Sequence, residues 1–234
     1  MTLTKIGLVL SLASVVLLAA GPFGTRAGVW TFVVGFGMLA LSLLLGLAGA
    51  GLSLVAGLKT GQWTLPLTGI AIGLAVVAMP SSVIVLARGA PPIHEISTDT
   101  EEPPAFVAIL PLRAGAANPP EYGGTAVAEQ QRRAFADIQP IVLRADAVQA
   151  FGRVLTAAQS LGWEVVGRDE STGRIEAVDT TFWFGFKDDI VIRLRGGADG
   201  TRVDIRSKSR VGLGDLGTNA RRVRAFLRAL REAT

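Results

Sequence analysis

Hydrophobic residues dominate the first 87 positions, and charged residues almost disappear from them. Lys5, Arg26 and Lys59 are the only charged side chains there, and they separate uncharged runs of 20, 32 and 28 residues. A helix of about 20 apolar residues crosses the hydrocarbon core of a bilayer, and a helix satisfies its own backbone hydrogen bonds. The pattern therefore predicts a membrane anchor over residues 1–88. Its three transmembrane helices are expected near residues 6–20, 30–58 and 63–86.

The first apolar run also fits a cleaved signal peptide. Lys5, an apolar stretch and then Ala19-Ala20-Gly21 follow the order of parts in such a signal. Two further apolar runs follow it, and this favours a retained helix.

Small residues recur at a spacing of four within the apolar runs. Gly49, Ser53 and Gly57 show this spacing, as do Gly69 and Gly73. Such residues let helix backbones approach closely. They predict either packing among the three helices of one chain, which we favour, or a homo-oligomer held by the small-residue faces. No run contains an ionisable residue, so ion or proton transport is not expected.

The pattern changes beyond residue 88. Residues 89–145 hold eight of the 11 prolines and predict an extended segment that wraps a core, with a short helix near 126–135. Residues 146–234 predict an α+β core with helices over 146–161 and 219–231. Strands are expected at residues 163–167, 174–180, 189–195 and 201–207. These elements predict an antiparallel four-stranded sheet with flanking helices.

One of these strands alternates clearly between apolar and charged positions. Ile190, Ile192 and Leu194 share one face, and Arg193 and Arg195 share the other. Side chains alternate across a strand, so this pattern predicts one buried face and one charged face.

The charge of the chain belongs almost entirely to its second part. The chain carries +4 overall, but 20 bases and 19 acids lie from Arg88 onward, which leaves +1 there. A nucleic-acid partner is therefore not expected. The chain has no cysteine and one histidine, which excludes disulfides and thiolate metal ligands, and we expect no metal and no cofactor.

Aromatic and charged side chains are densest over residues 179–189. The segment predicts either a ligand pocket or membrane-facing tip with charges at its mouth, or a strand pair with core aromatics and a solvated turn. Asp188 and Asp189 are adjacent on a strand and point to opposite faces, so they are a poor acid–base pair. The candidate ligand contacts here are Asp179, Phe184, Phe186, Lys187 and Asp188.

Glycines, hydroxyl groups and bases precede the last predicted helix. A helix N-terminus with such neighbours can hold an anion, so Lys208 and Arg210 are candidates to bind an anionic small molecule or a lipid headgroup. Alternatively, the glycines permit a tight turn and Asp215 caps the helix. The candidate residues are Ser207, Lys208, Ser209, Arg210, Asp215, Asn219 and Arg222.

Six short motifs follow one another in the soluble part of the chain. They are PPIHEISTD (91–99), PPAF (103–106), NPPEY (118–122), RIEAVDT (174–180), FGFKDD (184–189) and SRVGLGDLGTNARR (209–222). Together they resemble the domain-of-unknown-function 1499 family, over about residues 91–230. The resemblance implies bacterial membrane proteins with a few N-terminal spans, or plastid relatives in plants. It implies no established activity.

We therefore expect an integral protein of the cell inner membrane with its soluble domain in the periplasm. The lipid bilayer is its first partner. The expected function is that of a binding or interaction module of the cell envelope. One alternative is an enzyme, such as a hydrolase, in which Asp179, Asp188 or Asp215 meets a base, Lys187 or Arg210, in one cleft. The other alternative is a structural assembly factor.

Overall fold

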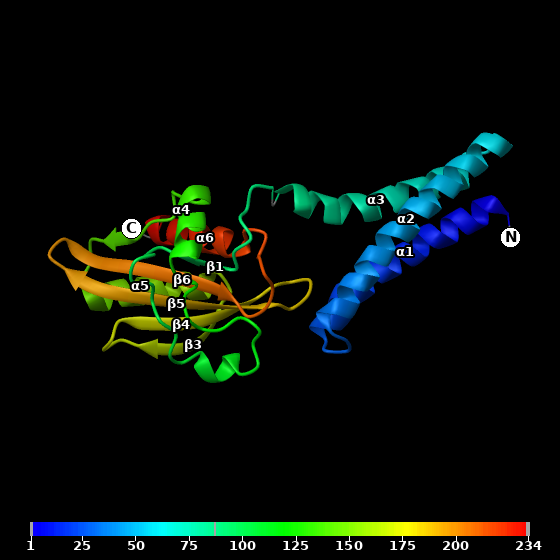
Figure 1. Cartoon of the computed structure of the whole chain (residues 1–234). Coiled ribbons are helices and arrows are strands. Elements are labelled where there is room, and N and C mark those ends of the chain that lie inside the picture. The colour runs from blue at the N-terminus through cyan, green and yellow to red at the C-terminus, as the bar shows by residue number, and fades with distance from the viewer. Residues whose placement is uncertain (1, 87, 233–234) are drawn as a thin grey trace. The chain divides into compact units, whose positions relative to one another are not determined.

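The computed structural model of the chain describes residues 2–86 and 88–232. The chain forms two compact units (Figure 1). The helical unit comprises Met1–Arg88 and the turn Phe182–Gly185, and the sheet unit comprises Gly89–Thr181 and Phe186–Thr234.

The helical unit contains three long apolar helices. They are α1 (Leu3–Arg26), α2 (Phe32–Thr60) and α3 (Thr64–Leu86). All three are long and apolar enough to cross a membrane, as the uncharged runs predicted. Gly61 ends α2 in a left-handed conformation with φ 68°, which glycine adopts without steric cost.

Small residues bring these helices together within one chain. A Cβ atom added to Gly49 of α2 would lie 2.4 Å from Ser11 Oγ and 2.7 Å from Ser11 N of α1. A Cβ added to Gly73 of α3 would lie 2.3 Å from Gly46 O of α2. The hydroxyl of Ser11 donates a hydrogen bond to Gly69 O at 2.8 Å. These faces pack within the unit, and a homo-oligomer through them stays a prediction.

The sheet unit is built on one antiparallel sheet with four further helical segments. Its strands are β1 (Glu95–Ser97), β2 (Ile141–Leu143), β3 (Glu164–Asp169), β4 (Arg174–Thr180), β5 (Lys187–Gly197) and β6 (Gly200–Ser209). Its helical segments are η1 (Leu110–Arg113), α4 (Gly124–Ala134), α5 (Ala147–Ser160) and α6 (Thr218–Glu232). The strand order is β1-β6-β5-β4-β3, and β2 also pairs with β6.

The prediction of a four-stranded sheet was wrong, because the sheet has six strands. The two additional strands come from the proline-rich segment and share one edge of β6. Glu95 of β1 pairs with Lys208, and Ile141 of β2 pairs with Val203. Each of these strands has three residues, which is too short to show an alternating pattern. Their pairing with β6 spans some 60 to 110 positions of sequence, which local patterns do not report.

The two faces of the sheet differ in chemistry. Helices α5 and α6 cover one face, where an apolar core includes Phe151, Phe226, Ile190 and Ile205. The other face carries a small apolar cluster around Val191. Its remaining buried side chains are largely charged: Glu95, Glu176, Asp189, Asp204, Arg206 and Lys208. The sheet therefore has one apolar core and one face of internal ion pairs.

The two ends of the sheet carry different connections. The β5–β6 hairpin turns at Ala198 and Asp199 at one end, and the turn between β4 and β5 lies at the other (Figure 1). The loop from Ser209 to Thr218 leaves the same end as the β4–β5 turn, because Asp188 pairs with Ser209.

Candidate functional site

Seven of the predicted site residues meet in one cluster on the helix-covered face, at the start of α6. We call this group the Arg222 cluster. Its members are Asp179, Asp188, Ser207, Ser209, Asp215, Asn219 and Arg222. It joins three neighbouring strands to the last helix.

Arg222 binds two carboxylates that lie opposite each other on β4 and β5. Asp179 and Asp188 are register partners, and like charges in such positions repel. Arg222 Nε donates to Asp179 Oδ2 at 2.8 Å, and its Nη2 donates to Asp188 Oδ2 at 2.6 Å. The guanidinium thus neutralises a repulsion that the strand register creates.

Hydroxyl and amide groups complete the Arg222 cluster. Asn219 Oδ1 accepts from Arg222 Nη1 at 2.7 Å and from Ser207 Oγ at 2.6 Å. Asn219 Nδ2 donates to Ser209 Oγ at 2.9 Å. Asp215 accepts from the backbone N–H groups of Gly217 and Asn219, both at 2.8 Å. Asp215 therefore caps the start of α6, which was one of the two interpretations of this segment.

Electrostatics favour a structural role for the Arg222 cluster. Burial raises the pKa of Asp188 above its ordinary value, and the Arg222 guanidinium opposes part of that rise. A raised carboxyl pKa suits a general acid, but Asp188 and Arg222 are both buried. The arrangement fixes α6 on the sheet.

The two basic candidates for anion binding lie on the opposite face and are paired with carboxylates. Lys208 is 1% exposed, and its Nζ donates to Glu95 Oε1 at 3.2 Å and to Glu121 O at 2.6 Å. Arg210 Nη2 donates to Asp189 Oδ1 at 2.7 Å. Burial lowers the pKa of Lys208, although Glu95 opposes this change.

The enzyme alternative could bring Asp188 and Arg210 into one cleft, but these two side chains lie on opposite faces of the sheet. Asp188 faces α6, whereas Asp189 faces the other way and binds Arg113 and Arg210. The sheet thus separates Arg210 from Asp188. Lys187 is exposed at the start of β5. The two adjacent aspartates do point to opposite faces, as the strand pattern predicted.

Glu95 was not among the predicted site residues, but it lies at the centre of a second group of buried charges. It is fully buried and binds two cations, Arg206 and Lys208. Arg206 also lies over the rings of Phe106, at 4.8 Å, and Tyr122, at 5.5 Å. Burial, reinforced by the Glu95 carboxylate, raises the pKa of Tyr122 to about 12. Glu95, Phe106, Tyr122, Arg206 and Lys208 form what we call the Glu95 group, which holds the segment before α4 against the sheet.

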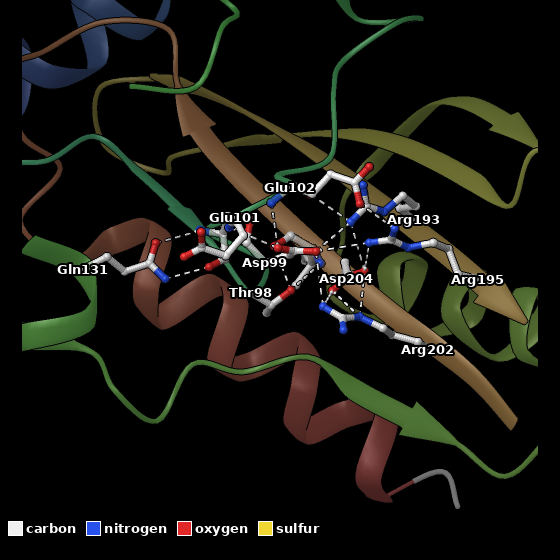
Figure 2. A network of polar contacts seen from close by, with 11 residues as sticks. Thr98, Asp99, Glu101, Glu102, Gln131, Arg193, Arg195, Arg202 and Asp204 are labelled. Atoms are coloured by element: carbon white, nitrogen blue, oxygen red, sulfur yellow. Dashed lines mark hydrogen bonds and ion pairs between the residues drawn. The ribbon is translucent and has the colours of Figure 1, made fainter. Parts of the chain in front are cut away.

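A third group of charges lies beside the β5–β6 hairpin, and we call it the hairpin cluster. Figure 2 shows Asp99 and Asp204 facing the guanidinium groups of three arginines. Asp99 Oδ2 accepts from Arg193 at 3.0 Å, from Arg195 at 3.1 Å and from Arg202 at 3.2 Å. Asp204 Oδ1 accepts from Arg202 Nη2 at 3.0 Å. Two carboxylates with little exposure therefore orient three guanidinium groups.

The hairpin cluster is open to solvent, unlike the others. Arg195 and Arg202 are 41% and 43% exposed at their side chains. They line a hollow of about 690 Å³ together with Asp99, Glu102 and the hairpin backbone. A second hollow of about 550 Å³ lies along the hairpin beside the start of α5. Charges held in fixed positions are therefore exposed to solvent here.

The acid at the centre of the hairpin cluster is held ionised. Burial tends to raise the pKa of Asp99, but the backbone N–H groups of Glu102 and Glu101 and the charges of Arg202 and Arg193 outweigh it. The pKa of Asp99 is therefore lowered below its ordinary value. Asp99 thus holds its negative charge among the arginines.

The comparisons with known proteins concern the part of the chain that forms the sheet unit. A family model described as a protein of unknown function (DUF1499) matches residues 95–230, more than half of the chain. The chain belongs to the DUF1499 family. A comparison with curated proteins found no match.

The DUF1499 match contains all six strands and all three charged groups, whereas α1, α2 and α3 precede it. The resemblance seen in the motifs is thus confirmed for the sheet unit. In the described part of the chain, no group of three or more histidine, aspartate or glutamate side chains is placed to hold a metal ion.

A sequence signal for the hairpin cluster did exist in the DUF1499 domain. Arg193 and Arg195 alternate with apolar residues on β5, and Arg202 and Asp204 do so on β6. The alternation identifies a charged face. It does not reveal that Asp99, about 100 positions earlier, supplies the shared carboxylate.

Proposed function

We propose that this chain is a membrane-tethered binding module of the cell envelope. Helices α1, α2 and α3 anchor it in the inner membrane, and the DUF1499 domain lies in the periplasm. It binds its partner at the hairpin cluster. One observation carries this proposal: Arg195 and Arg202 are exposed beside a hollow, while the Arg222 cluster and the Glu95 group are closed.

The lining of the hollow favours a polypeptide partner. It contains the acids Asp99, Glu101 and Glu102 as well as Arg195 and Arg202. A surface of mixed sign suits a partner that also carries both signs, and complementary charges select partners more than they add affinity. Arginine is also enriched at protein interfaces.

Glu102 is the group that a partner carboxylate would replace. Its contact with Arg195 Nη1 is 2.6 Å long, but its side chain is largely exposed. Exposed ion pairs contribute about 0–1 kcal/mol. The Arg195 guanidinium is therefore readily available, whereas Asp99 and Asp204 keep it oriented.

The proposal has a direct test because the chain has no cysteine. Ala198→Cys places a thiol at the hairpin turn, and Ala117→Cys places one in an exposed loop outside the hollow. An impermeant thiol reagent is expected to label both in intact cells. Protection of both until lysis would overturn the periplasmic placement.

The same two variants test the binding site. A photoactivatable crosslinker on residue 198 is expected to give a discrete adduct in intact cells, and one on residue 117 is not. The adduct is expected to disappear in the Arg195→Gln/Arg202→Gln background. Equal adducts from both positions, or an adduct that the arginine substitutions leave unchanged, would contradict binding at the hairpin cluster.

A further inference from the structure

The loop between β6 and α6 exposes two leucines for which the sheet unit provides no cover. Leu213 is 90% exposed and Leu216 is 52% exposed. Both lie in the motif Val-Gly-Leu-Gly-Asp-Leu-Gly of residues 211–217. Scattered exposed apolar residues are ordinary, so this pair needs support from its geometry and its place in the chain.

The loop has a fixed shape. Leu216 has a positive φ of 53°, the one non-glycine residue of this kind among those that the structure describes. Such a conformation costs about 1–3 kcal/mol, and hydrogen bonds from Arg221 Nη1 to Leu216 O, at 2.9 Å, and from Asp215 N to Ile93 O, at 3.1 Å, hold it. Asn118 Nδ2 donates to Gly212 O at 3.0 Å. The leucines are thus presented by a rigid loop.

The loop also lies beside the segment that connects α3 to β1. A Cβ added to Gly214 would lie 3.3 Å from Pro92 Cα, and one added to Gly217 would lie 3.6 Å from Ala90 Cβ. Only residues 87–90 carry the chain from Leu86 to Ala90, and they span about 14 Å when fully extended. The backbone connection therefore keeps the loop close to the end of an apolar helix that is long enough to cross a membrane.

The charges around the loop suit an anionic membrane surface. Arg221 is exposed and bonds to Leu216 O of the loop, and Lys187 is exposed beside Arg210, the residue before the loop. Arg88 is the first charged residue after α3. Basic side chains near a membrane are attracted to anionic headgroups. Asp215 is the acid within the loop, and its oxygens are occupied by the backbone of Gly217 and Asn219.

We propose that the loop of residues 211–217 is a second membrane-binding element, which inserts Leu213 and Leu216 into the headgroup region of the leaflet where α3 ends. It fixes the orientation of the DUF1499 domain, so that the β5–β6 hairpin points away from the bilayer. This inference does not depend on which side of the membrane the domain occupies, nor on a partner at the hairpin.

The test uses the full chain in vesicles of phosphatidylcholine and phosphatidylglycerol. A nitroxide spin label is attached to Leu213→Cys, and to Ala198→Cys as the control at the opposite end of the sheet. Its accessibility to oxygen, which concentrates in lipid, is compared with its accessibility to a water-soluble nickel complex. We expect residue 213 to favour oxygen and residue 198 to favour nickel.

Two results would overturn the proposal. One is a label at residue 213 that the nickel complex reaches as readily as it reaches residue 198. The other is a label at residue 213 that neither reagent reaches, which would indicate that protein covers the loop. As a second measurement, Leu216→Ser is expected to shift the insertion equilibrium about tenfold toward the free loop, because one partly buried leucine is lost, and so to lower the oxygen-to-nickel ratio at residue 213. An unchanged ratio would also contradict insertion.

Discussion

Asp179 and Asp188 lie directly opposite each other on β4 and β5, and Arg222 of α6 binds both. The strand register alone would place two negative charges side by side. The helix supplies the cation that makes this register compatible with folding. The last helix is therefore tied to the sheet by charge as well as by its apolar face.

Loss of Arg222 is expected to destabilise the sheet unit strongly. Arg222→Ala leaves Asp188 buried without its cation, and removal of one partner of a buried ion pair costs about 3–5 kcal/mol. Thermal unfolding of the full chain in detergent, followed by circular dichroism, measures the effect. Arg228→Ala, at an exposed position on the same helix, is the control and is expected to change stability by no more than about 0.5 kcal/mol. Similar losses in both variants would show that the pairing with the aspartates is unimportant.

Loss of the Glu95 carboxylate is expected to lower the stability of the sheet unit more than loss of the Lys208 ammonium group. Glu95→Gln leaves Arg206 and Lys208 buried without a carboxylate and is expected to cost about 3–5 kcal/mol. Lys208→Met keeps the Glu95–Arg206 pair and removes a buried cation whose hydration is lost, so its cost is expected to be below about 1 kcal/mol. Urea unfolding of the two variants gives this difference. A larger loss in Lys208→Met would refute the unequal roles.

The ion pairs of Asp99 in the hairpin cluster are expected to stabilise the folded sheet unit at neutral pH and to lose this effect in acid. The pKa of Asp99 is lower in the folded state than its ordinary value, so its contribution is present above the unfolded-state pKa, near about 4. That contribution is lost as the pH falls through the folded-state pKa. Asp99→Asn is expected to show a smaller fall in melting temperature below about pH 4 than the unmodified chain. Parallel pH profiles would contradict this linkage.

The close approach of α1 and α2 is expected to depend on Gly49. A side chain at Gly49 would collide with the backbone and hydroxyl of Ser11, whereas Gly51 has open space around its Cβ position. Gly49→Val is expected to lower the temperature at which the helical unit unfolds in detergent by several degrees, and Gly51→Val, the matched control, is expected to leave it nearly unchanged. Equal effects would show that helix propensity matters and that packing does not.

Much of the fold follows from local patterns. The uncharged runs predicted three apolar helices, and the periodicity of residues 146–161 and 219–231 predicted α5 and α6. The motifs predicted membership of the DUF1499 family. Four of the strands were predicted, and the alternation of apolar and charged residues was clearest for residues 189–195. The strands β1 and β2 escaped prediction because they are short and form only against β6.

The candidate site was likewise predicted only in part, because local patterns do not report which distant residues meet. The residues of the Arg222 cluster come from two segments of the sequence, 179–189 and 207–222, and the structure brings both segments together at one end of the sheet. Lys208 and Arg210 were grouped with these residues from the sequence, but they lie on the opposite face of the sheet. These residues are neighbours of Ser207 and Ser209 in sequence, but alternation along β6 sends them to the other face.

By itself the sequence determined the division of this protein into an apolar, almost uncharged part and a balanced, charged part. It did so because membrane crossing and strand or helix formation depend on the composition and period of short segments. Only the tertiary structure decided which charges meet. Asp99 reaches three arginines about 100 positions away, and Glu95 reaches Arg206 and Lys208 more than 100 positions away. A basic side chain is either buried in an internal ion pair or exposed to solvent. Which of the two applies depends on the assembled sheet and on the segments that cover it.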